Sequence, residues 1–303
     1  MKIVRSALLV GLCLAAAPVS ADPLVIVTTS NATTLVNSIL GPGVTLVAGS
    51  ATLIGASTQQ GTFTGGAGVL PFASGILLTT GDANLAPGPN DTESAGETTG
   101  TGGNAALTLL GGDKTFDQNV LQFSFVPTGG SVNFQFVFAS EEYDEFVDAG
   151  VNDVFAFFLN GANLAVVPGT STAISIDTVN CGANPAFYSA NSDESACFTA
   201  SEAVNTQYDG LVGGLFATPL FATGNVNPGV SNTIQIAIAD GGDAIYDSAV
   251  FLAGGSFIAP PLPPLPPLPP PTSEIPEPAT MTMLGVGLAG MAARRYRRRQ
   301  QDH

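Results

Sequence analysis

Hydrophobic and polar residues alternate with a period of two in several segments of the central part of the chain. The clearest segments are 121–125, 132–138 and 234–238, where Phe, Leu, Val or Ile residues alternate with mostly polar residues. This pattern is typical of strands that bury one face against a core. Two further segments, 154–159 and 249–252, are apolar on both faces, as expected for central strands of a sandwich.

Turn residues connect these segments closely. An Asn-Gly pair at 160–161 and a Pro-Thr-Gly-Gly sequence at 127–130 lie between apolar segments, and they predict tight hairpins because Asn and Gly tolerate positive φ angles. Helical patterns are few, and the best of them, 33–40 and 105–110, are short. We therefore predict an all-β fold, an antiparallel two-sheet β-sandwich that is jelly-roll-like, with one or two short helices and with targeting helices at the chain ends.

Charge is distributed very unevenly along the chain. The 303 residues include 8 Lys or Arg and 24 Asp or Glu, which gives a formal net charge of −16. The basic residues lie almost entirely near the two ends, and Lys114 is the only one between positions 22 and 271. This central segment has no basic patch that could contact phosphates, so nucleic acid is excluded as a partner.

The residue types needed for many catalytic mechanisms are also missing from the central segment. The only His is His303, and the chain contains no Trp. Mechanisms with Ser-His or Cys-His pairs, and zinc sites with His ligands, therefore have no His available there. We expect that the protein is not an enzyme.

Residues 1–21 have the three parts of a secretory signal peptide. Lys2 and Arg5 form a positive region, an apolar region follows, and small residues precede the expected cleavage site after Ala21. We expect signal peptidase to remove this segment. A membrane-anchoring helix is the alternative, but the apolar run ends at Pro18 and is too short to span a bilayer.

Export makes a disulfide the expected state of the remaining cysteines. Cys13 lies in the signal peptide, which leaves Cys181 and Cys197 in a chain bound for an oxidising compartment. We predict that Cys181 and Cys197 form one disulfide. Two free buried thiols are the alternative.

The C-terminal part of the chain begins with residues 259–274, which are rich in Pro and Leu and predict a semi-rigid polyproline II linker. Residues 275–303 then contain a Pro-Glu-Pro tripeptide, an uncharged run at 279–293 and an arginine cluster. The run is short for a bilayer, but we predict that it forms a transmembrane helix whose arginines lie in the cytoplasm. The residues of the tripeptide and the first arginines are Pro276, Glu277, Pro278, Arg294 and Arg295.

This C-terminal arrangement resembles the PEP-CTERM sorting signal of Gram-negative bacteria. In that family, a membrane protease called the exosortase recognises the signal and processes proteins for the cell surface or the extracellular polymer matrix. The resemblance implies that the exosortase is a processing partner and that an inner-membrane-tethered intermediate precedes release to the surface or matrix. A plain C-terminal anchor is the alternative.

Residues 22–258 are expected to form one domain, which resembles the choice-of-anchor L domain over about Thr33 to Phe257. The similar segments are 136–143, 152–155, 239–240 and 246–251, with shorter ones at 41–44, 74–76 and 208–210. The family is named for its occurrence with different surface-attachment signals, and no biochemical activity is established for it. The resemblance therefore implies a location and a fold class, and it leaves the function open.

Acidic residues gather directly after two of the predicted strands. Because the domain has one Lys and no Arg, convergence of these carboxylates would require solvent, raised pKa values or a bound cation. We hypothesise that they bind one or more calcium ions, which prefer carboxylate and carbonyl oxygens; a solvated acidic rim is the alternative. The expected ligands are Glu141, Glu142, Asp153, Asp240, Asp243 and Asp247.

These inferences favour an exported protein of the cell surface or of an extracellular (biofilm) matrix, with a structural or adhesive role and extracellular polysaccharide as a candidate partner. One alternative is a surface carbohydrate-active enzyme that uses paired carboxylates as acid and base. Another is a carbohydrate-binding module. The lack of Trp disfavours the enzyme, because sugar-binding clefts are usually lined with aromatic residues.

Overall fold

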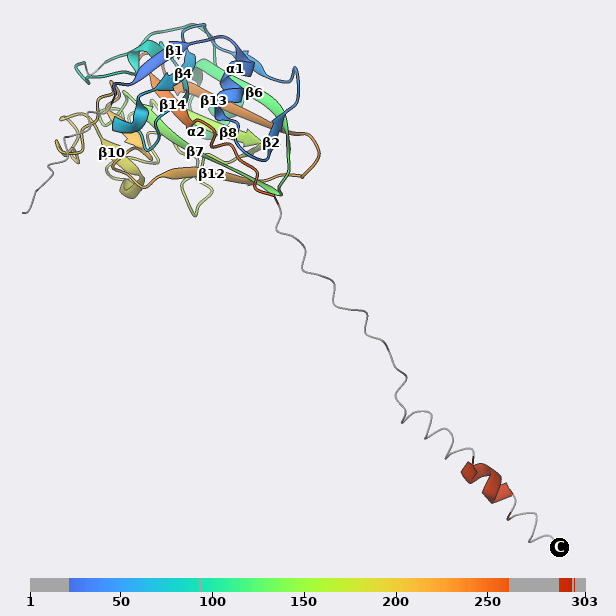
Figure 1. Ribbon diagram of the computed structural model, residues 1–303. Helices are drawn as coiled ribbons and strands as arrows, with labels where there is room; N and C mark the ends of the chain where they lie inside the picture. The colour runs from blue at the N-terminus through green and yellow to red at the C-terminus, as the bar shows by residue number, and fades with distance from the viewer. Residues whose placement is uncertain (1–21, 93, 262–288, 296, 298–303) are drawn as a thin grey trace, which may run out of the picture. The chain divides into compact units, whose positions relative to one another are not determined.

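The structure is a computed structural model that describes residues 22–92, 94–261, 289–295 and 297 (Figure 1). The chain divides into two compact units, residues 1–262 and 263–303. The predicted signal peptide with its cleavage site, most of the proline-rich linker and the Pro-Glu-Pro tripeptide lie outside the described residues.

Strands dominate the first unit and pair in two antiparallel sheets (Figure 1). The strands of the larger sheet are β1 (Val25–Thr28), β4 (Gln60–Thr64), β5 (Gly75–Thr79), β7 (Ser131–Ser140), β10 (Tyr188–Ala190), β11 (Gly210–Val212), β12 (Leu220–Asn225) and β14 (Ser248–Ala253). Their order is β1-β4-β5-β14-β7-β11-β10, and β12 also pairs with β7. The long strand β7 is therefore central, with β14 on one side and with β11 and β12 along the other.

The second sheet is smaller and contains the other two long strands. Its members are β2 (Val44–Leu46), β3 (Thr52–Ile54), β6 (Thr115–Pro127), β8 (Val154–Leu159), β9 (Ala162–Asn163) and β13 (Asn232–Gly241). Their order is β2-β6-β13-β8-β9, and β3 also pairs with β6. Strands β6, β7 and β13 contain the segments with the clearest alternation in the sequence.

The main core lies between the two sheets and is rich in Phe. Phe157 of β8 packs edge-on against Phe134 and Phe136 of β7, with ring centroids 4.9 Å apart in each pair. These rings belong to one buried cluster that contains residues of both sheets. Edge-to-face pairs of this kind add to the stabilisation that burial provides. The prediction of an all-β, antiparallel two-sheet sandwich is confirmed.

One of the two predicted hairpins is wrong. Residues 127–130 join β6 to β7, and these strands lie in different sheets. Both strands direct Phe side chains into the common core, where Phe125 and Phe134 contact the same Phe257 ring, so they stack and do not pair. The Asn-Gly turn does form: it connects β8 to β9, with φ angles of 48° and 90° at residues 160 and 161.

Two short α-helices lie close to the predicted positions. They are α1 (Ala32–Ile39) and α2 (Ala105–Gly111). Asn31 and Asn104 cap them, because each side-chain oxygen accepts hydrogen bonds from backbone N–H groups of the first turn. Three short 3-10 helices, η1 (Gly66–Gly68), η2 (Ala83–Leu85) and η3 (Pro185–Phe187), occur in connections.

The sandwich extends slightly into the predicted linker. Ala259 is fully buried, and its N–H donates to the carbonyl of Pro42 at 3.0 Å. The preceding residue, Ile258, exchanges backbone hydrogen bonds with Asn133. The folded domain therefore ends after Ala259, because the chain is still hydrogen-bonded to the sheet there.

In the second unit, residues 289–295 and 297 are helical and exposed. Arg294 and Arg295 of the arginine cluster lie in this helix. Among the described residues, no helix is both long enough and apolar enough to cross a membrane. Most of the predicted transmembrane run, residues 279–288, lies outside the described residues.

Candidate functional site

Five of the six expected calcium ligands lie where strands of the two sheets begin or end. Glu141 and Glu142 follow β7, Asp153 precedes β8, Asp240 is the penultimate residue of β13 and Asp247 precedes β14. Each of these residues is at most 3% exposed. They therefore do not form a solvated acidic rim.

Three carboxylates form a row across the larger sheet. Ser140, the last residue of β7, pairs with Ser248 of β14 on one side and with Gly210 of β11 on the other. The same register extended by one residue places Glu141 between Asp247 and Asp209. The N–H of Glu141 donates to the carbonyl of Asp247 at 3.1 Å, which continues this register. Opposed residues of antiparallel strands direct their side chains to the same face. The register therefore brings together three acidic residues that are far apart in the sequence.

A second group belongs to the smaller sheet. β8 pairs with β13 in a register that makes Asp153 and Asp240 neighbours across the two strands. Burial raises the pKa of Asp240 and of Glu142, and the charge of Asp153 is the next cause in each case, so Asp153 interacts electrostatically with both.

Asp153 also connects the two sheets. Its Oδ1 accepts a hydrogen bond from the N–H of Gly241 in β13 at 2.9 Å. Its Oδ2 accepts one from the hydroxyl of Ser248 in β14 at 2.6 Å. Because Asp153 has donors on both oxygens, it contributes to the structure even without a ligand.

Several carboxylate oxygens of the two groups lack a hydrogen-bond partner. Within the described residues, the buried unpartnered atoms of these groups are Glu141 Oε1, Glu142 Oε2, Asp240 Oδ1 and Asp247 Oδ2. The other oxygen of Glu141 accepts from the N–H of Ala95 at 3.4 Å, and that of Asp247 accepts from the N–H of Glu97 at 3.1 Å. A buried polar atom without a partner is costly, and a buried charge more so.

Burial is the main reason why these carboxyl groups have raised pKa values. It raises the pKa of Glu141 to about 9, with contributions from the charges of Asp209 and Asp247. The pKa of Glu142 also rises to about 9, through burial and the charge of Asp153. Burial further raises the pKa of Asp247 to about 8 and that of Asp153 to about 7, and it places the pKa of Asp240 well above its usual range. At neutral pH the ionised forms of Glu141, Glu142, Asp240 and Asp247 are therefore unfavourable unless positive charge is supplied, whereas Asp153 is close to half ionised.

Asp243, the sixth expected ligand, differs from the others. It is partly exposed, and its Oδ1 accepts a hydrogen bond from the N–H of Ile245 at 3.1 Å within the same loop. Its charge nevertheless raises the pKa of Glu142 and Asp153. Asp243 thus lies at the margin of the second group.

Two residues that shape the site, Asp209 and Gly81, were not predicted from the sequence. Asp209 is a single acid before a short strand, and only the sheet register brings it next to Glu141. Gly81 lies against Asp247: a Cβ added to it would be 1.7 Å from Asp247 Oδ2. No local pattern in the sequence signals either contact, although Asp209 lies in one of the segments that resemble the family.

Comparison with known families accounts for nearly the whole described chain. Residues 23–258 match the model of the choice-of-anchor L domain. The chain belongs to the choice-of-anchor L domain family. Residues 274–299 match the PEP-CTERM protein-sorting motif, so this choice-of-anchor L protein is exported and sorted to the surface through an exosortase. Both resemblances seen in the sequence are confirmed. Neither a curated protein nor a solved structure matches the chain.

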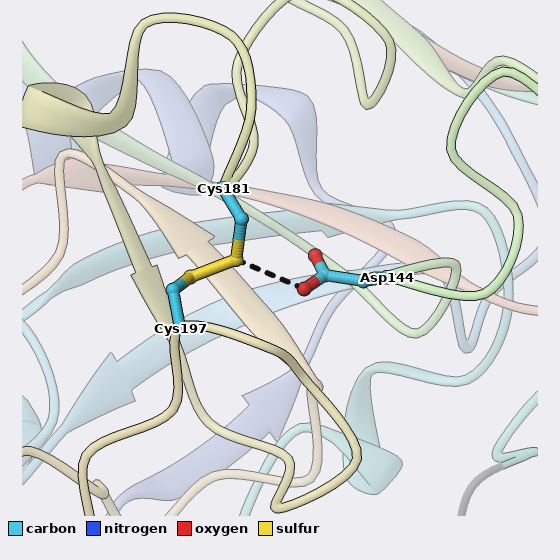
Figure 2. A group of neighbouring side chains, drawn as sticks. All are labelled: Asp144, Cys181 and Cys197. Carbon is cyan, nitrogen blue, oxygen red and sulfur yellow. Dashed lines mark hydrogen bonds between the residues drawn. A yellow bond between two sulfur atoms is a disulfide. The ribbon is translucent and has the colours of Figure 1, made fainter.

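The choice-of-anchor L domain of this chain also contains a disulfide. Cys181 and Cys197, the expected pair, are bonded, with their Cα atoms 5.9 Å apart. Asp144 lies beside the bond, with one carboxylate oxygen 3.0 Å from the Cys181 sulfur (Figure 2). The same carboxylate accepts hydrogen bonds from the hydroxyls of Tyr188, at 2.9 Å, and Ser195.

Among the described residues, Asp144 and the two cysteines are the only three acidic or sulfur side chains whose ligand atoms all lie within 4.8 Å of one another. This trio does not suit a metal ion, because disulfide sulfurs are not thiolates. The same distance limit shows that no three carboxylates of the buried groups converge on one point. An ion bound to those groups would therefore use two carboxylates at a time.

A separate surface hollow of about 510 Å³ lies next to the disulfide loop. Its lining includes Asn90, Asp91, Asn191, Asp193, Phe198 and Asn205. The hollow does not include the buried carboxylates, but its lining residue Asn90 donates a hydrogen bond to Asp209 Oδ1 at 2.7 Å.

Proposed function

We propose that this choice-of-anchor L protein is a non-enzymatic structural or adhesive component of the cell surface or extracellular matrix. The burial of its acidic residues carries this proposal. A general acid or base must come within hydrogen-bond reach of the bond that it acts on. Glu141, Glu142, Asp153, Asp240 and Asp247 are each at most 3% exposed, which keeps them from a polymeric substrate.

The sorting motif supports a defined route to that location. Signal peptidase removes residues 1–21, and the C-terminal run then holds the chain in the inner membrane with the arginine cluster in the cytoplasm. The exosortase acts on this tethered intermediate at the Pro-Glu-Pro signal. The sandwich is then released to the cell surface or matrix.

Carbohydrate binding at the hollow is a second candidate function. The hollow offers Asn and Asp side chains for hydrogen bonds to hydroxyl groups and Phe198 as an apolar contact. Pockets of several hundred Å³ with a few polar groups are typical of small-ligand sites. This function is compatible with adhesion, because a sugar site would attach the protein to extracellular polysaccharide.

Incubation of the purified protein with the extracellular polysaccharide of the producing cells tests both candidates. We expect the protein to co-sediment with the polysaccharide and to release no new reducing ends. Formation of reducing ends that Glu141→Gln or Glu142→Gln abolishes, without a change in melting temperature, would overturn the non-enzymatic proposal.

Variants of the hollow then separate the two binding modes. If the hollow is the sugar site, Phe198→Ala and Asn205→Ala will reduce co-sedimentation at least tenfold. Phe216→Ala is the matched control, because Phe216 is 47% exposed and does not line the hollow. Equal binding by all three variants would remove the hollow as a sugar site and leave adhesion through another surface.

A further inference from the structure

We propose that the end of the larger sheet binds a calcium ion between the carboxylates of Glu141 and Asp247. These residues lie opposite each other at the ends of β7 and β14. Each has one carboxylate oxygen held by a backbone N–H of the segment 95–97. Each leaves its other oxygen buried and without a hydrogen-bond partner. The unpartnered oxygens, Glu141 Oε1 and Asp247 Oδ2, are the ligands that the proposal assigns to the ion.

No side chain of the domain can supply the missing positive charge. Lys114 is the only basic residue between positions 22 and 271. It is exposed, and its Nζ lies 4.3 Å from the centre of the Phe116 ring. The row of Glu141, Asp247 and Asp209 is therefore balanced either by protons or by a cation from solution.

Protons alone satisfy this arrangement poorly. A protonated carboxyl group becomes a hydrogen-bond donor and needs an acceptor. Within the described residues, Glu141 Oε1 and Asp247 Oδ2 have no hydrogen-bond partner. A cation removes both problems at once, because it neutralises the charge and coordinates the unpartnered oxygens.

The donor set suits calcium better than other common cations. The atoms on offer are hard oxygens, and there are no His or free Cys ligands in the domain for a softer metal. Calcium accepts 6–8 oxygens at about 2.3–2.6 Å in flexible geometry, whereas magnesium requires a near-ideal octahedron. Among the residues that the structure describes, no three carboxylates have oxygens within 4.8 Å of one another, which is about twice a calcium–oxygen bond. The ion thus takes two carboxylates and completes its shell with carbonyl oxygens or water.

The absence of a side chain at position 81 makes room for this site. An ideal Cβ at Gly81 would lie 1.7 Å from Asp247 Oδ2 and 2.3 Å from Asp247 Oδ1. Any other residue at this position would displace the carboxylate toward the sheet or push the chain away. Gly81 therefore acts as a positioning residue for Asp247.

Calcium titration of the purified protein tests the proposal. Extracellular calcium modules bind with Kd values of about 0.1–1 mM. At a calcium concentration ten times Kd, the unfolding equilibrium constant should fall about 11-fold, and the melting temperature should rise relative to a sample in EDTA. Magnesium at the same concentration should produce little change, and an equal response to magnesium would overturn the assignment to calcium.

Neutral variants locate the effect. Glu141→Gln and Asp247→Asn keep the shape of the side chain but remove a charge, so they should fold without calcium and lose the calcium response. Glu202→Gln is the matched control, because Glu202 is exposed and its charge is not among those that shift the pKa of Glu141 or Asp247, so its replacement should leave the response unchanged. A calcium response that is retained in both Glu141→Gln and Asp247→Asn would overturn the proposal.

Terbium luminescence gives a second readout that does not depend on stability. Terbium occupies calcium sites and emits when a nearby Tyr is excited. Tyr208 is buried next to the row, since the charges of Asp247 and Glu141 contribute to the raised pKa of its hydroxyl. We expect saturable emission that calcium displaces and that Tyr208→Phe reduces severalfold. The absence of any emission, or full emission from Tyr208→Phe, would contradict a site at Glu141 and Asp247.

Discussion

Removal of the disulfide offers a quantitative test of how the 181–197 loop is held. The double substitution Cys181→Ala, Cys197→Ala opens a loop whose ends are 16 residues apart in the sequence. The disulfide lowers the conformational entropy of the unfolded chain, and loop-closure entropy predicts that it thereby raises the free energy of unfolding by about 3 kcal/mol. Since Asp144 keeps its hydrogen bonds to Tyr188 and Ser195, the fold itself should survive the change.

Urea denaturation followed by Tyr fluorescence measures this effect, because the chain contains no Trp. For a domain of this size, each kcal/mol corresponds to about 2–4 °C in melting temperature, so the double variant should melt about 6–12 °C lower. A reductant should lower the stability of the native protein to a similar extent and leave the double variant unchanged.

A loss of less than about 1 kcal/mol in the double variant would refute this reasoning. It would mean that residual structure already restricts the unfolded chain without the disulfide, or that strain in the folded state offsets the entropy. A steeper dependence of the unfolding free energy on urea concentration would instead indicate that the denatured state is less compact without the disulfide. The control Ser195→Ala, which removes one donor to Asp144 and keeps the disulfide, separates the contribution of the hydrogen bond.

Three further predictions concern the acidic row and the sorting signal. In EDTA, the free energy of unfolding should fall as pH rises from about 4 to about 9. The folded state keeps protons up to a pKa of about 7 at Asp153 and about 9 at Glu141, whereas the unfolded state loses them near pH 4. Calorimetry that shows a flat or rising profile would contradict the raised pKa values. Gly81→Ala should destabilise the domain by about 1–3 kcal/mol through its clash with Asp247, whereas Gly182→Ala, which meets its nearest neighbour only at 3.5 Å, should change little in the same denaturation assay. Replacement of the Pro-Glu-Pro tripeptide by three Ala residues should leave an unprocessed chain in the inner-membrane fraction, and normal release of the shortened chain in an immunoblot would rule out recognition at that tripeptide.

Much of the fold follows from local patterns, and these are the parts that were predicted well. The alternation in β6, β7 and β13 identifies half-buried strands wherever they pair, since side chains alternate between the faces of any strand. The Asn-Gly turn after β8 is equally local, because two residues that accept positive φ suffice to reverse the chain. Short strands such as β9, β10 and β11 contain two or three residues each, too few to show a period.

The pairing of the strands could not be predicted in the same way. The Pro-Thr-Gly-Gly sequence at 127–130 indicates a reversal of the chain, but it does not determine whether the next strand pairs beside β6 or crosses to the other sheet. That choice depends on where the apolar faces of β6 and β7 meet. Both faces point into the same Phe-rich core, and burial of that core places the strands in different sheets.

Local patterns and composition were sufficient to identify the sorting motif, the shortage of basic residues and five acids that the fold gathers. Motifs, charge and composition can be read from the sequence without knowledge of the structure. The three-dimensional structure was needed to show that these acids are buried, that Asp209 lies beside Glu141, and that Gly81 leaves space for Asp247. The register between strands sets these neighbours, and that register depends on packing across the whole sandwich.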